Sequence, residues 1–246
     1  GALGVPWQTA LAAVVVEGLL FVALTAVGAR EYVIGLFPKP VKFAVGTGIG
    51  LFLAIIGLQA MGIVVGDEAT LVTLGSVASN PVAILSVLGL FLTLGLYARD
   101  VPGSIIIGIV VTTVAGWVLT RFGPISPEAG LVTGSTTVTY DITPLAGAFV
   151  SGLANVEAFT FALVVFTFFF VDFFDTAGTL VGVGQAGGFL DENGELPDID
   201  RPLMADAVGT TVGGALGTST VTTYIESASG VEEGGRTGLT ALTVAG

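Results

Sequence analysis

Residues 159–183 read FTFALVVFTFFFVDFFDTAGTLVGV, and this stretch decides the class of fold. It is almost entirely apolar and is long enough to cross the roughly 30 Å hydrocarbon core of a bilayer as an α-helix. Its two charged residues, Asp172 and Asp175, are three positions apart and therefore share one helix face. A charged side chain inside a membrane costs several kcal/mol, so such acids are functional candidates by default. The stretch predicts a membrane helix that carries a functional acid.

The whole chain has the composition of a membrane protein. Of its 246 residues, 53% are hydrophobic and 11% are charged, whereas a soluble domain carries about 25% charged residues. Its 37 glycines favour close helix packing, because small residues make the contacts between membrane helices. We therefore expect an all-α polytopic membrane protein embedded in the lipid bilayer. Besides 159–183, the apolar runs of spanning or near-spanning length are 8–29, 43–65, 81–97, 103–120 and the shorter, glycine-broken 203–217.

The chain contains no cysteine and no histidine. This excludes a disulfide framework, a Cys/His zinc site and a histidine general base, and we predict neither a metal nor a cofactor. The net charge of −12 argues against a nucleic-acid partner. Five of the acids lie in one loop between Asp191 and Asp200. Together with the scarcity of lysine, they favour a halophilic source over an ordinary bacterium with one acidic loop.

Basic residues in the short loops predict the orientation in the membrane. Arg30, Lys39 and Lys42 lie between the first two apolar runs, and Arg99 and Arg201 fall on the same side if the spans alternate. Short cytoplasmic loops are enriched in lysine and arginine, so this side is predicted to be cytoplasmic. The spans themselves offer almost no base that could pair with the intramembrane acids. This favours a functional role for those acids over a structural one.

A second informative stretch, which is polar, covers residues 217–230 and reads GTSTVTTYIESASG. Its threonines, valine and tyrosine favour extended backbone, and a helix-compatible segment begins at Glu226. Extended backbone at membrane depth is tolerated only where it is buried in protein or lines a cavity. One interpretation is therefore a broken helix that points backbone N–H groups into a site, with Glu226 at the break. The alternative is an ordinary surface loop with a capping acid.

Three long segments resemble the AzgA-like purine permeases, a branch of the second nucleobase–cation symporter family within the xanthine/uracil permease superfamily. They read DFFDTAGTLVGVGQAG over 172–187, ADAVGTTVGGALGTSTVTTYIESASGVEEGGRTGLTA over 205–241, and GIGLFLAIIGLQAMGIVV over 48–65. The resemblance implies a fragment of a transporter with fourteen spans in two inverted repeats of seven, with a short β-strand in the broken tenth span.

The same resemblance implies a division into a core and a gate domain. Residues 1–29 would form the fourth span, in the core domain, and 43–122 would form the fifth to seventh spans, in the gate domain. Residues 145–246 would hold the eighth span to the start of the tenth, again in the core domain. On this basis we expect the chain to be an internal piece of a longer transporter, with part of the substrate site supplied by spans before residue 1.

Functional residues follow from the motifs of the related uracil and xanthine branches. These branches have an acid three residues before a glycine in the eighth span, which here selects Asp175 rather than Asp172. They also have the sequence TTY followed by one residue and then a glutamate, and the matching glutamate in this chain is Glu226. The resemblance implies that Asp175 and Glu226 bind the nucleobase and that one of them carries the coupled proton. The further implied substrate contacts are Thr179, Ile225 and Ser227, and the implied supporting residues are Asp172, Gly178, Thr223 and Tyr224.

The predicted function is import of adenine, guanine and hypoxanthine across the plasma membrane by proton symport with alternating access. The related branches often have a histidine where this chain has Thr179, and they have a shorter segment where this chain has SASG after Glu226; by the resemblance, these departures fit the purine branch rather than pyrimidine substrates. Sodium remains an alternative coupling ion, and a monomer or a homodimer is compatible with the sequence. The alternatives are a xanthine/uracil permease, an anion transporter of the same architecture, which two acids disfavour, and a channel. An enzyme is not expected, because an intramembrane aspartyl protease would need a GxGD-type pattern that the chain lacks.

Overall fold

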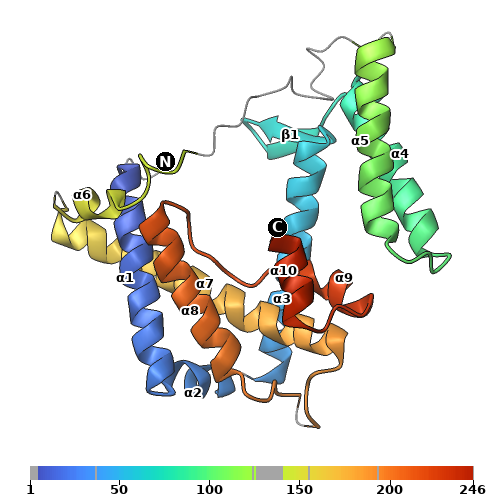
Figure 1. Cartoon of the computed structure of the whole chain (residues 1–246). Helices are drawn as coiled ribbons and strands as arrows, with labels where there is room; N and C mark the ends of the chain where they lie inside the picture. Colours follow the sequence, from blue (N-terminus) through green and yellow to red (C-terminus); the bar gives the residue numbers. More distant parts are fainter. Residues whose placement is uncertain are drawn as a thin grey trace. The chain divides into compact units, whose positions relative to one another are not determined.

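The computed structural model describes residues 5–36, 38–123, 125, 141–154, 156–192 and 194–245, which are mostly helical (Figure 1). The helices are α1 (Trp7–Ala26), α2 (Ala29–Gly35), α3 (Lys39–Ala60), α4 (Pro81–Tyr97), α5 (Ser104–Phe122), α6 (Ala148–Ala154), α7 (Ala158–Gly187), α8 (Asp200–Leu216), α9 (Ser227–Glu232) and α10 (Gly238–Ala245). The strands β1 (Val64–Asp67) and β2 (Leu71–Leu74) and the 3-10 helix η1 (Val77–Ser79) complete these elements.

Contacts divide the chain into two compact units. Unit 1 comprises Gly1–Ile49 and Tyr140–Gly246, and unit 2 comprises Gly50–Thr139, so the boundary falls within α3. Three helices are long and apolar enough to cross a membrane by length and composition, namely α1, α5 and α7. Residues 46–60 of α3 and the whole of α4 are shorter apolar helices in the described residues.

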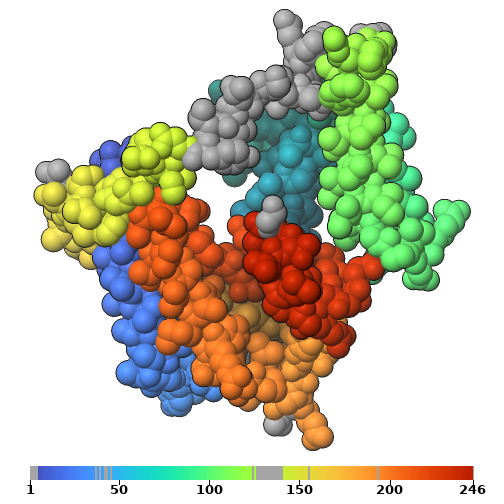
Figure 2. Space-filling view, viewed as in Figure 1, coloured from blue at the N-terminus to red at the C-terminus, as the bar shows by residue number. Residues whose placement is uncertain are grey.

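In unit 1, α1 is the central helix and packs against α2, α6, α7 and α8. Its contact with α8 is especially close, and the space-filling view shows the two helices in contact (Figure 2). A Cβ atom added to Gly18 of α1 would come within 2.7 Å of the backbone nitrogen of Thr211. One added to Gly214 of α8 would come within 3.2 Å of the nitrogen of Val15. Glycine therefore allows the two backbones to touch, as in other membrane helix pairs.

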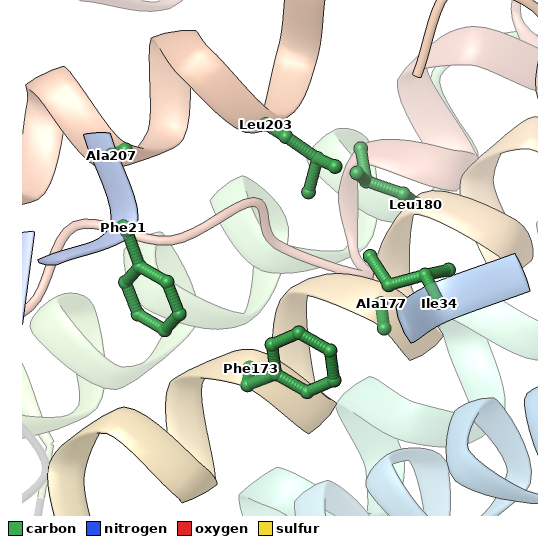
Figure 3. Close-up of a cluster of buried hydrophobic side chains, with 7 residues drawn as sticks. All are labelled: Phe21, Ile34, Phe173, Ala177, Leu180, Leu203 and Ala207. Carbon is green, nitrogen blue, oxygen red and sulfur yellow. The ribbon is translucent and has the colours of Figure 1, made fainter. Parts of the chain in front are cut away.

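An apolar cluster joins α1, α2, α7 and α8 (Figure 3). Its buried members are Phe21, Ile34, Phe173, Ala177, Leu180, Leu203 and Ala207. The ring of Phe21 also stacks on Phe169 of α7, with the centroids 4.6 Å apart. This cluster fixes the relative positions of the four helices that carry the polar residues described below.

In unit 2, α4 and α5 pack against each other through two reciprocal glycine–threonine contacts. Gly89 of α4 lies against Thr112 of α5, and Gly108 of α5 lies against Thr93 of α4. Each threonine hydroxyl donates to a carbonyl of its own helix, Thr93 to Gly89 at 2.9 Å and Thr112 to Gly108 at 2.7 Å. These hydroxyls are thus satisfied within their own helices, and in both contacts the hydroxyl oxygen is the threonine atom nearest the opposite glycine.

The start of α4 has a strong capping signal. The Oδ1 atom of Asn80 accepts hydrogen bonds from the backbone N–H groups of Val82, at 3.0 Å, and Ala83, at 3.4 Å. Pro81 occupies the first helical position, where its missing N–H group costs nothing. The structure has a helix with the predicted bounds 81–97, and this capping explains where it begins.

Two details of the predicted fold are wrong. The apolar run 43–65 is not one helix, because α3 ends at Ala60 and β1 follows after Gly62, whose φ of +72° interrupts the helix. β1 pairs with β2 in an antiparallel hairpin whose register places Val64 opposite Leu74. The described part of the chain is therefore not purely α-helical, because short apolar runs rich in valine and isoleucine suit strands as well as helices.

The short strand predicted for the broken tenth span is also not formed. Residues 218–224 are irregular, and the sheet in the described residues consists of β1 and β2. Their polar groups turn to α8 instead of to a neighbouring strand. The N–H group of Thr218 donates to Gly213 at 2.9 Å, and the hydroxyl of Thr210 donates to the carbonyl of Val221 at 2.7 Å. The segment is thus held as irregular backbone along α8.

Candidate functional site

Polar side chains gather in the interior of unit 1, next to the apolar cluster. They come from four helices that are far apart in sequence. The buried members are Glu17 of α1, Arg30 of α2, Asp172 and Thr176 of α7, and Asp206 of α8. Buried charged groups are rare in proteins unless they are paired or functional, so this set is the strongest site signal in unit 1.

An ion pair between Arg30 and Asp206 lies at the centre of this set. The Nη2 atom of Arg30 is 2.9 Å from Oδ2 of Asp206, and Nη1 donates to the carbonyl of Leu203 at 3.1 Å. The guanidinium also lies over the ring of Phe21, 3.9 Å from its centroid, which is a favourable cation–π geometry. Arg30 is therefore a buried cation whose two terminal nitrogens are both engaged, while its Nε atom has no hydrogen-bond partner among the described residues.

This position corrects two sequence-based interpretations. The sequence predicts Arg30 as a base in a cytoplasmic loop, and it predicts almost no base in the spans that could pair with their acids. In the structure, α2 begins after Gly28, whose φ of +71° separates it from α1, and Arg30 is buried in the core. Asp206 was missed as well, although an acid inside the short apolar run 203–217 was a visible signal.

Hydroxyl groups connect this ion pair to the acid predicted to bind substrate. The Oγ1 atom of Thr176 lies 3.3 Å from Oδ2 of Asp206, 3.5 Å from Oδ1 of Asp172 and 3.2 Å from Oγ1 of Thr222. The hydroxyl of Thr222 in turn donates to Oδ2 of Asp175 at 3.4 Å. These distances are at the long end for O–H···O hydrogen bonds. The contacts nevertheless form a continuous polar path from the interior to Asp175.

A cavity of about 300 Å³ opens beside this path. It is lined by Thr167, Phe168, Val171, Asp172, Asp175, Thr220 and Thr222. Its volume is at the lower end of the range for small-molecule sites. The lining combines an aromatic ring, two carboxyl groups and several hydroxyls. Such a set can cover one face of a planar heterocycle and accept hydrogen bonds from its ring N–H groups.

The two acids of α7 have different surroundings. Asp175 is half-buried, lines the cavity and accepts the hydrogen bond from Thr222. Asp172 is 5% exposed, lines the same cavity and also faces the ion pair through Thr176. One of its carboxylate oxygens, Oδ2, has no hydrogen-bond partner among the described residues. Asp172 therefore links the cavity to the buried charges, which its spacing in the sequence did not reveal.

The predicted residues around the helix break lie outside the cavity lining. Glu226 is exposed and immediately precedes α9, where its side chain makes no capping hydrogen bond. Its charge acts on Asp175, so the two predicted acids are within electrostatic range. Ile225 packs on α7, where a Cβ on Gly182 would come within 2.6 Å of its Cδ1 atom. Ser227 is exposed at the start of α9.

The remaining predicted residues lie on α7 and in the segment before Glu226. Thr179 is buried in α7, and its hydroxyl has no hydrogen-bond partner among the described residues. Gly178 is buried beside it. Thr223 is half-buried and Tyr224 is exposed. The structure thus brings Asp172, Asp175 and the unpredicted Thr222 to one cavity, while the roles of the others stay predictions.

The described residues contain no group of three His, Cys, Asp or Glu side chains that is arranged to hold a metal ion. The acids of α1, α7 and α8 share their surroundings with an arginine instead. Membrane-length apolar helices around a charged interior and a small cavity are the features of an integral membrane transport protein.

The permease family (Xan_ur_permease) matches this chain over residues 2–245, and the chain belongs to that family. The family resemblance predicted from the sequence motifs is therefore confirmed. A permease family indicates a transporter rather than an enzyme.

Curated relatives align along nearly the whole chain. A putative permease of Methanocaldococcus jannaschii is 44% identical over 98% of this chain and 53% of its own length. The guanine/hypoxanthine permease PbuG of Bacillus subtilis is 41% identical over 96% of this chain and 52% of its own length. The adenine permease AdeP of Escherichia coli is 37% identical over 99% of this chain and 52% of its own length. The chain thus spans about half the length of these relatives.

Proposed function

We propose that the protein to which this chain belongs imports purine nucleobases across the plasma membrane. The observation that carries the proposal is the cavity of about 300 Å³ that Asp172 and Asp175 line together within a membrane-type helix unit. Membership in the permease family and the names of two relatives, a guanine/hypoxanthine permease and an adenine permease, support the choice of substrate. Adenine, guanine and hypoxanthine are the proposed substrates.

In the proposed complex, Asp175 accepts hydrogen bonds from ring N–H groups of the purine, and the ring of Phe168 covers one face. The hydroxyl of Thr222 orients the Asp175 carboxylate through the 3.4 Å hydrogen bond. Glu226 is the second proposed substrate acid, and its electrostatic coupling to Asp175 supports this role. Thr179, Ile225 and Ser227 complete the proposed binding set on the strength of the family motif.

Transport itself is proposed to be proton symport by alternating access. Residues 1–29 and 145–246 would belong to the core domain, and residues 43–122 would belong to the gate domain. The separation of contacts into two units, with a boundary inside α3, supports a two-part arrangement. An acidic site without a metal cluster in the described residues is compatible with a proton as the coupling ion.

Uptake measurements test this function. The complete protein would be expressed in a host that lacks purine uptake, and labelled adenine, guanine, hypoxanthine, xanthine and uracil would be supplied in turn. We expect saturable uptake of at least one of the first three. Asp175→Asn and Glu226→Gln should lower uptake by roughly tenfold or more, as expected for the loss of hydrogen bonds to a charged group. The matched control is Glu68→Gln, because Glu68 is exposed in the hairpin turn.

Uptake of none of the three purines would contradict the proposal. Uptake of xanthine or uracil alone would select the xanthine/uracil permease instead. A rate that does not respond to a pH gradient would remove the proton coupling and make sodium the next ion to test.

A further inference from the structure

Glu17 is a buried carboxyl group that the proposed purine site does not use. It lies in α1, one of the membrane-length helices, and is 0% exposed. Neither of its carboxylate oxygens has a hydrogen-bond partner among the described residues. An ionised carboxylate without partners in an apolar interior is unfavourable by tens of kcal/mol in the idealised limit, so such a group takes up a proton. The burial of this carboxyl group without a hydrogen-bond partner among the described residues therefore requires an explanation.

The charged groups that face Glu17 come from each of the charged helices packed around it. They are Asp172 of α7, Arg30 of α2 and Asp206 of α8, and the hydroxyl-bearing Thr220 lies beside it. Among these charges, Asp172 acts on it most strongly. Arg30 is already bound to Asp206 and to the Leu203 carbonyl. Three carboxyl groups thus share one engaged guanidinium, and the cluster is neutral only if protons are bound to it.

A metal ion is a poor occupant of this cluster. The described residues include no three-carboxyl arrangement that would hold one, and the Arg30 guanidinium repels any cation placed among the acids. A proton needs no coordination sphere and binds to a single carboxylate oxygen. The chemistry of the cluster therefore selects a proton.

Asp172 gives the cluster a connection to substrate. It is close enough to Glu17 for the two charges to interact, and it also lines the cavity. Thr176 and Thr222 continue the contact as far as Asp175. A change of charge at Asp172 when a ligand binds therefore acts on Glu17.

We propose that Glu17 is a proton-binding residue of the transport cycle and holds the coupled proton while the site is closed to water. This inference rests on the proposed purine–proton symport and names the group that carries the ion. One proton from water on the outer side binds a Glu17 carboxylate oxygen. The same proton leaves to water on the inner side when the cluster opens, and no other bond is made or broken.

The test uses the complete protein in proteoliposomes and two assays. Counterflow measures exchange of labelled for unlabelled purine without a proton gradient, and accumulation measures uptake driven by an inward gradient of one pH unit. A one-proton symporter converts that gradient into about tenfold accumulation. We expect Glu17→Gln, which is neutral and of the same size, to retain counterflow and to lose accumulation. Glu68→Gln should retain both.

The two assays separate the possible failures. A wild-type protein without purine counterflow would contradict the proposed function itself. A wild-type protein that exchanges and accumulates purine, with a Glu17→Gln variant that accumulates equally well, would overturn the role of Glu17 alone. Loss of both activities in a Glu17→Gln variant that remains folded would overturn it as well.

A second measurement does not depend on transport. Infrared difference spectra between low and high pH report the carbonyl band of protonated carboxylic acids. We expect Glu17→Gln to remove part of that band, and Glu17→Asp, which keeps a carboxyl group, to retain it. An unchanged band in Glu17→Gln would contradict the proposal even if this variant were too unstable for transport assays.

Discussion

Arg30 of α2 and Asp206 of α8 form a 2.9 Å ion pair whose two side chains are buried from solvent. The pair ties the short helix after α1 to α8, which lies far away in the sequence. It also places the cation of the cluster where it neutralises one of three acids. Its integrity should therefore matter both for the fold and for the charge of the site.

Removal of one partner of this pair is expected to destabilise the protein strongly. Arg30→Ala leaves Asp206 buried without its cation, which typically costs about 3–5 kcal/mol. Thermal unfolding in detergent should show a clearly lower Tm. The matched control is Arg201→Ala, because Arg201 pairs with Asp198 at 3.5 Å on the surface, where such pairs contribute little. Equal Tm values for the two variants would contradict the buried role of Arg30.

The contact between α1 and α8 is expected to be intolerant of a single methyl group. In Gly18→Ala, the new Cβ would lie 2.7 Å from the backbone nitrogen of Thr211, and backbone cannot move aside as a flexible side chain can. Overpacking of this kind costs about 1–3 kcal/mol. Gly95→Ala in α4 is the control, because no described atom lies within 4 Å of the added Cβ. The prediction fails if both variants unfold at the same temperature.

Thr222 is expected to act through Asp175 rather than through stability. Thr222→Val removes the hydroxyl that donates to Asp175 and contacts Thr176. We expect a loss of about 1 kcal/mol in substrate binding, which is roughly fivefold in apparent affinity. Uptake kinetics would measure it, with Thr113→Val as the control because that hydroxyl donates only within α5. Unchanged affinity in Thr222→Val would break the proposed link between this hydroxyl and the substrate acid.

Asp67 gives the hairpin turn a pH dependence. The N–H and hydroxyl of Thr70 and the N–H of Ala69 donate to its carboxylate and hold the pKa of Asp67 below its ordinary value. A lowered pKa stabilises the folded turn above the ordinary value, and this stabilisation is lost as the pH falls through the lowered pKa. Amide hydrogen exchange at Ala69 and Thr70 should therefore quicken, relative to an unstructured peptide, as the solution becomes acidic. Asp67→Asn should abolish that dependence, and a dependence that persists in the variant would exclude Asp67 as its source.

Sequence reasoning succeeded where the signals are local. The Asn80-Pro81 pair marks the start of α4, and the long apolar run with two acids marks α7 and places Asp172 and Asp175 on one face. It failed where a position depends on contacts across the chain. The burial of Arg30 arises because the backbone breaks the helix at Gly28 and α2 packs on α1 and α8. A loop base and a core base look identical in the sequence.

The predicted single helix over 43–65 and the predicted strand before Glu226 are wrong for a related reason. Val64 and Val65 are as apolar as the helix before them, and their pairing with Leu74 and Thr73 makes them part of a strand. Residues 218–224 have strand-like side chains, yet their polar groups are bound by α8. In both segments, the neighbouring segment that supplies the hydrogen-bond partners decides the backbone conformation, and the intrinsic preference of the side chains does not.

The backbone contact at Gly18 and Thr211 limits how the buried acids can be reached. Because glycine brings the α1 and α8 backbones this close, we expect the two helices to move together, and α1 carries Glu17. We therefore expect water to reach this carboxyl on the side of α7 and the irregular residues 218–224. The movement of the proposed transport cycle is thereby expected on that side, which also carries the cavity lined by Asp172 and Asp175.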